Sequence, residues 1–76
     1  MNEMIHTIAG KEFTHSELAE AFDNTWNTLK RGTDRSAESK VRAAKFCLSC
    51  VDAGVVSDKK AASVTRVCGA MLKAVN

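Results

Sequence analysis

The architecture of this chain follows from residues 37–54, which read AESKVRAAKFCLSCVDAG. At about 100° per residue, the apolar side chains of this stretch fall into two stripes on opposite sides of one helix. The first stripe holds Ala37, Val41, Ala44, Leu48 and Val51, and the second holds Ala43, Phe46, Cys50 and Ala53. A helix that is apolar on most of its circumference is normally buried. We therefore expect a helix over about 35–53 that lies between two other helices, or whose Phe46 side meets another molecule.

Within this stretch, Cys47 and Cys50 have the C-x-x-C spacing of zinc sites and thiol redox centres. A redox site needs a lowered thiol pKa, typically at a helix N-terminus, whereas this pair comes late in the expected helix. A zinc site needs four ligands. Cys68 with His6 or His15 could complete such a set, but a second close pair of ligands is missing. Because cysteine is among the most often buried residue types, we interpret the cysteines as small core residues and expect neither a metal nor a cofactor.

A second helix is expected before this segment, over about 15–31. In the sequence FTHSEL, Thr14 and Glu17 form a capping box, and Phe13 with Leu18 forms a hydrophobic staple. Apolar side chains then recur at helical spacing, at Leu18, Phe22, Trp26 and Leu29.

A third helix is expected over about 58–75, with Ser57 as its N-cap. Its apolar stripe consists of Ala61, Val64, Cys68, Met71, Leu72 and Val75. The central helix has two candidate N-caps, Asp34 and Ser36. Gly69 falls inside the third helix, where glycine costs about 1 kcal/mol relative to alanine. A close contact with another helix, or with a second subunit, would explain why a glycine occupies this position.

For residues 4–13, MIHTIAGKEF, the sequence leaves two secondary structures open, strand and loop. Ile5 and Ile8 favour a strand, and residues 9–11 could turn the chain back. An isolated hairpin is barely stable, so it would have to lie on the helices or pair with another copy. The fold class is therefore mainly α. We predict one compact three-helix domain over residues 1–76, with helices at about 15–31, 35–53 and 58–75. The prediction leaves room for a short β-hairpin at the N-terminus.

Charge is unevenly distributed along the 76 residues, although the net charge is only +2. Residues 1–30 carry a balance of −3, and residues 31–76 carry +5. Lys59, Arg66 and Lys73 recur every seven residues, so they line one side of the third helix. Such a stripe could contact phosphates or an acidic protein face. An ordinary solvated face is an equally open interpretation.

Several classes of function are disfavoured. No apolar run approaches the roughly 20 residues of a membrane span. Three cysteines without a signal peptide indicate a cytoplasmic protein with reduced thiols. We expect no enzyme, because the sequence has no phosphate loop, nucleophile elbow or paired-carboxylate pattern. A DNA-reading helix-turn-helix fits poorly, since Lys60 and Ser63 fall where buried apolar residues are needed.

The segment IAGKEFTHSELAEAFDN, residues 8–24, resembles the N-terminal stretch of small bacteriophage-encoded proteins. The resemblance covers less than a quarter of the chain and implies no activity and no site residues. It implies an accessory protein of a phage or mobile element, and such proteins often bind a host or defence component.

These observations together predict a non-enzymatic binding module that inhibits or redirects a host macromolecular machine in the bacterial cytoplasm, such as a defence complex. The alternative is a small nucleic-acid-binding regulator that uses the basic stripe of the third helix. The expected partner is a host protein or a nucleoprotein complex, with a homodimer left open and no membrane involved. The predicted partner-binding residues are Phe46, Trp26, Lys59, Arg66 and Lys73.

Overall fold

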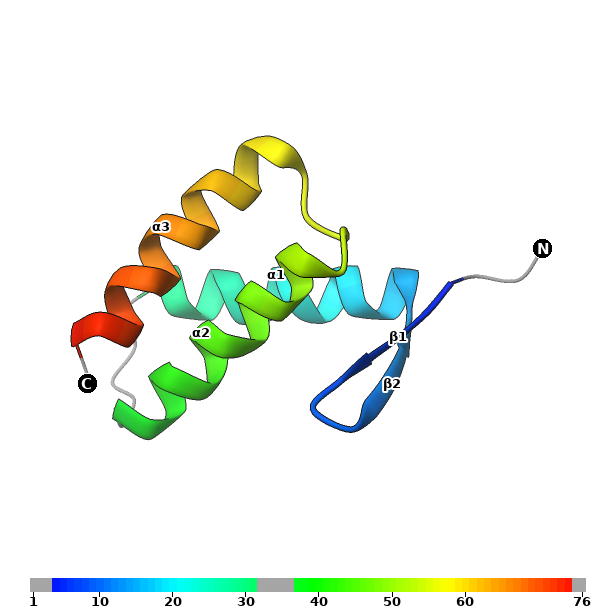
Figure 1. Cartoon of the computed structure of the whole chain (residues 1–76), viewed down its shortest axis with the longest axis horizontal. Helices are drawn as coiled ribbons and strands as arrows, with labels where there is room; N and C mark the ends of the chain where they lie inside the picture. The colour runs from blue at the N-terminus through cyan, green and yellow to red at the C-terminus, as the bar shows by residue number, and fades with distance from the viewer. Residues whose placement is uncertain (1–3, 32–36, 75–76) are drawn as a thin grey trace.

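The computed structural model describes residues 4–31 and 37–74, in which a β-hairpin precedes three helices (Figure 1). The elements are β1 (Ile5–Ile8), β2 (Lys11–Thr14), α1 (His15–Arg31), α2 (Ala37–Asp52) and α3 (Asp58–Ala74). The predicted fold class is confirmed, and residues 4–13 form strands rather than a loop. The candidate caps Asp34 and Ser36, and Val75 of the third apolar stripe, lie outside the described residues.

The helix ends follow from local hydrogen bonds. At the start of α1, the Thr14 N–H donates to Glu17 Oε1 at 2.9 Å, and the Glu17 N–H donates to Thr14 Oγ1 at 3.1 Å. This is the predicted capping box, and an N-cap of this kind contributes about 1 kcal/mol. At the start of α3, the Lys60 N–H donates to Ser57 Oγ at 3.4 Å, as expected for its N-cap. The C-terminal end of α2 is closed by Gly54, whose φ of +80° suits a left-handed cap.

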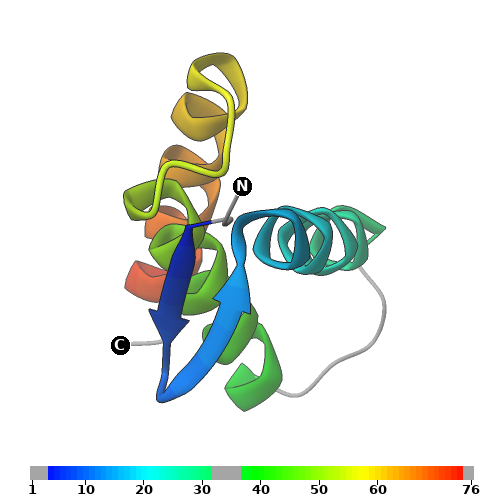
Figure 2. The same ribbon diagram turned by 90° about the vertical axis from the view of Figure 1, so that its right-hand side faces the viewer.

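The hairpin is a two-stranded antiparallel sheet that lies beside the first turn of α1 (Figure 2). Its two-residue turn has positive φ at Ala9 (52°) and Gly10 (81°), which is the pattern of a type I′ turn. The His15 N–H donates to the Met4 carbonyl at 2.9 Å, and the His6 and His15 rings share a hydrogen bond of 3.2 Å. These bonds hold the base of the hairpin to the helix.

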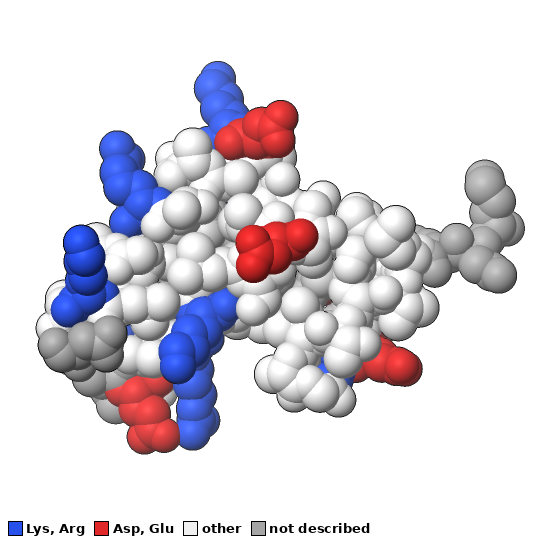
Figure 3. Space-filling model, viewed as in Figure 1, with Lys and Arg blue, Asp and Glu red and all other residues white. Residues whose placement is uncertain are grey.

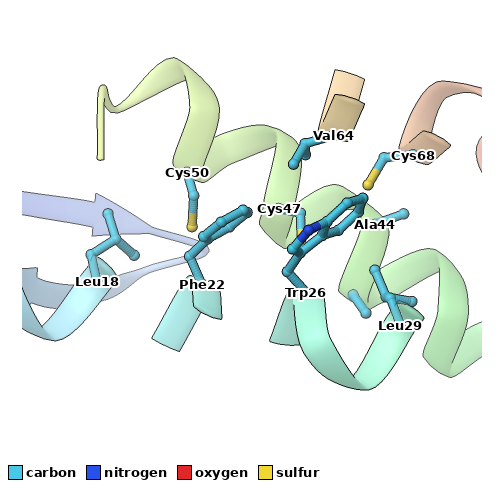
Figure 4. Close-up of a cluster of buried hydrophobic side chains, with 10 residues drawn as sticks. Leu18, Phe22, Trp26, Leu29, Ala44, Cys47, Cys50, Val64 and Cys68 are labelled. Atoms are coloured by element: carbon cyan, nitrogen blue, oxygen red, sulfur yellow. The ribbon is translucent and has the colours of Figure 1, made fainter. Parts of the chain in front are cut away.

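The core forms where α2 packs between α1 and α3 (Figure 4). Of the two alternatives for the central helix, its position between the other two is therefore confirmed, and contact of its Phe46 side with another molecule stays a prediction. Its most buried side chains lie along the boundary between the two predicted stripes, and all are small: Ala43, Ala44, Cys47 and Cys50. Small side chains there leave room for the large residues of α1, including Phe22 and Trp26, whose rings stack with centroids 6.3 Å apart. The core also contains Leu18, Leu29, Val64 and Cys68.

The expected close contact at Gly69 is not found within the described part of the chain. A Cβ atom added to this glycine would meet none of the described atoms within 4 Å. The physical reason is that α2 packs against the Val64 and Cys68 side of α3, where both residues are fully buried, and not against the glycine.

Gly69→Ala should therefore stabilise the folded chain by about 1 kcal/mol, because alanine restricts the unfolded chain and favours helix. For a domain of this size, that gain corresponds to a rise in Tm of about 4–8 °C. Thermal unfolding followed by circular dichroism measures the change. Gly54→Ala is the control, and it should lower Tm because alanine is strained at a positive φ. A lower Tm for Gly69→Ala would contradict the open environment seen here.

Candidate binding surface

A groove separates the hairpin from α2. It consists of two adjoining depressions of about 530 and 450 Å³. The first is lined by Ile8, Ala9, Arg42, Lys45, Phe46 and Ser49, and the second by Ile5, His6, Thr7, Ile8, Ser49, Asp52 and Ala53. Because Ile8 and Ser49 line both depressions, the two form one continuous surface, which we name the β1–α2 groove.

Phe46 forms the apolar part of this groove. Its side chain is half-buried and packs against the core, and its ring meets the Phe13 ring edge-on with centroids 6.1 Å apart. A third, smaller depression of about 330 Å³ lies against Phe46 on the side of Thr25 and Ala43. The predicted interface residue is therefore accessible from two sides, while its backbone belongs to the most enclosed helix.

The three predicted cations of α3, Lys59, Arg66 and Lys73, are all exposed. Figure 3 shows basic side chains projecting along the edge of the molecule that α3 forms. Among the described residues, none of these three lies within salt-bridge distance of a carboxylate. Lys60 differs, since its Nζ is 3.7 Å from an Asp23 carboxylate oxygen in α1. With respect to the described residues, the stripe is therefore an unpaired positive surface, separate from the β1–α2 groove.

Trp26 lies mainly in the core. Only 5% of its surface is exposed, and it stacks on Phe22. It also lines a depression of about 440 Å³ between α1 and α3, next to Lys59 and Lys60. A side chain this deeply buried offers little area to a partner, so its main contribution is to the packing of α1.

The interpretation of the cysteines as core residues is confirmed by their burial, since Cys47, Cys50 and Cys68 all have 0% exposure. Burial raises the pKa of Cys47 to about 12, with further contributions from the neighbouring Cys68 and Cys50. Burial likewise raises the pKa of Cys50 to about 11, and it raises the pKa of Cys68. All three thiols therefore stay protonated near neutral pH, which is the reverse of what a redox or metal-binding thiolate requires.

Some of the other titratable side chains that the sequence brought into consideration have structural partners. Glu17 completes the capping box, and His6 bonds His15. Within residues 4–31 and 37–74, no group of three or more histidine, cysteine or acidic side chains is arranged to hold a metal ion. Over the same residues, no helix combines the length and apolar character needed to span a bilayer.

Sequence reasoning identified Phe46 but missed the hairpin wall of the groove, formed by Ile8 and Ala9. The wheel of the central helix also contained an unused signal. Arg42 lies four residues before Phe46, and Ser49 and Ala53 lie three and seven residues after it, so one side of this helix was already a mixed polar and apolar surface. The sequence of the helix does not show which other segment of the chain packs against this side.

Comparison of the whole chain with models of protein families, with curated proteins and with solved structures finds no match in any of the three.

Proposed function

We propose that this chain is a non-enzymatic binding module of a phage or mobile element. It acts in the bacterial cytoplasm, where it attaches to a host protein or nucleoprotein complex and inhibits or redirects it. The observation that carries the proposal is the β1–α2 groove, in which the half-buried Phe46 is flanked by the cations Arg42 and Lys45. Aromatic anchors in concave sites, with charged groups at the rim, are typical of protein recognition.

The way in which α2 is held supports this function. Because α2 packs between α1 and α3, the position of Phe46 is set before any partner arrives. A preformed site loses less conformational entropy on binding than a flexible one. A domain of 76 residues has a small core. A binding site on its central helix is held in place directly by that core.

A second function is favoured by one separate observation, the exposed stripe of Lys59, Arg66 and Lys73, which has no carboxylate partner among residues 4–31 and 37–74. Residues seven apart on a helix are about 10.5 Å apart along its axis, so the three cations can approach separate phosphates of a nucleic acid. Three phosphate contacts on duplex DNA would give a slope of about −2.7 for log affinity against log salt.

The test is an affinity capture of the tagged chain from bacterial lysate, divided into nuclease-treated and untreated halves. A protein retained in both halves by the wild type, and lost at least tenfold with Phe46→Glu, is the expected result. Leu48→Glu is the matched control, because it places the same charge at a half-buried position of α2 outside the groove. Circular dichroism confirms that each variant is folded.

Loss of every captured molecule after nuclease treatment would contradict the protein-binding proposal. It would favour the nucleic-acid function, provided that reversing the charges of the α3 stripe also removes the salt dependence. Equal losses for Phe46→Glu and Leu48→Glu in folded variants would remove the groove from the proposal.

A further inference from the structure

We propose that the β1–α2 groove receives an extended peptide segment of the partner protein, which adds to the free edge of β1 as a third strand. This inference rests on the proposed function and names the form of the partner. It follows from the backbone of β1, the opposite wall formed by α2, and the charges at the two ends of the groove.

The first argument is the hydrogen-bond pattern of the hairpin. Ile8 pairs with Lys11 across the two-residue turn, and His6 pairs with Phe13. In an antiparallel ladder, bonded pairs alternate with non-bonded pairs, so the N–H and C=O groups of Ile5 and Thr7 point away from β2. No described backbone group outside the hairpin bonds to either residue. An open strand edge of this kind is a template for an added strand.

The second argument is the position of this edge. All four residues of β1 line the groove, and the opposite wall is the helix surface formed by Ser49, Asp52 and Ala53. Figure 2 shows β2 next to α1 and β1 on the side of β2 that is away from α1. An added strand lies about 4.8 Å from β1, with α2 beyond it. A single extended segment adds one strand at this edge, whereas the hairpin of a second copy would add two strands and would need room for both beside α2.

The length of the groove sets the length of the segment. The four residues of β1 extend over about 13 Å. On the opposite wall, the lining residues run from Arg42 to Ala53, which is about 16 Å at the rise of a helix. Four or five extended residues cover either distance.

The third argument is charge. Beside Ile8, the groove has Arg42 and Lys45, whereas its other end has Asp52. Arg42 is already bonded to Glu38 at 2.8 Å, so Lys45 is the cation available to a ligand. The segment should therefore carry an acidic side chain beside Lys45, an apolar side chain against Phe46, and a basic side chain beside Asp52.

Two capped synthetic peptides, EVTVK and KVTVE, probe this inference in the two possible strand directions. Each is titrated into the ¹⁵N-labelled chain while amide shifts and hydrogen exchange are followed. One of the two should shift and protect the Ile5 and Thr7 amides. Lys45→Glu should weaken that peptide at least fivefold, whereas Lys40→Glu, an equal charge change at an exposed α2 position that does not line the groove, should leave its affinity unchanged.

Two proline variants test the edge itself. Thr7 and Glu12 are cross-strand partners whose N–H groups both point out of the ladder, on opposite edges of the hairpin. Proline is tolerated at such edge positions because the ladder needs no donor there. Thr7→Pro should reduce binding of the peptide and of the captured partner at least tenfold, and Glu12→Pro should leave both unchanged.

The outcomes separate this inference from the proposed function. If the captured protein is lost with Phe46→Glu but kept with Thr7→Pro, the strand-addition inference is wrong and the binding function stands. If the wild type captures no protein, the binding function itself fails. Peptides that leave the Ile5 and Thr7 amides unchanged at millimolar concentration also overturn the inference. A concentration-dependent dimer that is detected by sedimentation and abolished by Thr7→Pro would also overturn the inference, because a second copy would then occupy the edge.

Discussion

Phe22→Ala is expected to remove about 3–5 kcal/mol from the free energy of unfolding, which is the usual cost of deleting a buried aromatic side chain. Phe22 is only 2% exposed and stacks on Trp26 at the centre of the helix packing. Single domains have stabilities of about 0.05–0.15 kcal/mol per residue, so this loss is a large part of the total for a chain of 76 residues. The variant should be largely unfolded at 37 °C.

Urea denaturation measures the effect, with the single tryptophan, Trp26, as the fluorescent reporter and circular dichroism as the independent probe. Phe13→Ala is the control, because Phe13 is half-buried on the hairpin and has less contact to lose. The loss in free energy of unfolding expected for Phe13→Ala is less than half that expected for Phe22→Ala. Equal costs for the two variants would mean that the hairpin, rather than the helix packing, limits the stability of the chain.

The second large effect concerns the thiols. Under native conditions, Cys47, Cys50 and Cys68 should react with an aromatic disulfide reagent about 10³-fold more slowly than in denaturant, or slower still. Two causes act together: each thiol has 0% exposure, and burial raises the pKa of each, so little thiolate is present at pH 8. The thiols can then react only after the core has opened. The free energy of this opening approaches that of global unfolding.

Ser49→Cys is the internal control for this experiment, because it adds a thiol on the same helix, where the wild-type side chain lines the β1–α2 groove. The new thiol should be labelled at a rate close to that of a small-molecule thiol, while the three native thiols stay protected. Rapid labelling of Cys47 or Cys50 in the folded chain would contradict their role as core residues and would reopen the redox interpretation of the C-x-x-C spacing.

The elements that the sequence predicts correctly are those whose signals are local. The capping box at Thr14 and Glu17 joins residues three apart, so its two hydrogen bonds form as soon as the helix does. Ser57 and Gly54 act within one turn in the same way. The position of the central helix was also predictable, because a helix that is apolar on most of its circumference is normally buried.

The parts that could not be predicted depend on contacts between distant segments. A helical wheel gives the angle of each side chain but not the distance to its neighbours, so Gly69 was assigned a contact that the described residues do not make. Trp26, at the edge of the apolar stripe of its helix, was open between an interface anchor and a large core residue, and the packing of the helices leaves only 5% of it exposed. Exposure is a property of the whole packing arrangement, not of a segment.

By itself, the sequence therefore determined the helices, the N-caps of the first and third of them, the buried nature of the cysteines and the separation of charge along the chain, because these depend on residue type and on neighbours within a turn or two. Only the tertiary structure decided that the hairpin lies beside α1 with β1 toward α2, and that Ile8 and Phe46 line one groove. The physical reason is that this groove joins residues far apart in the sequence. Its shape arises from the angle at which separately stable elements pack, and no local pattern encodes that angle.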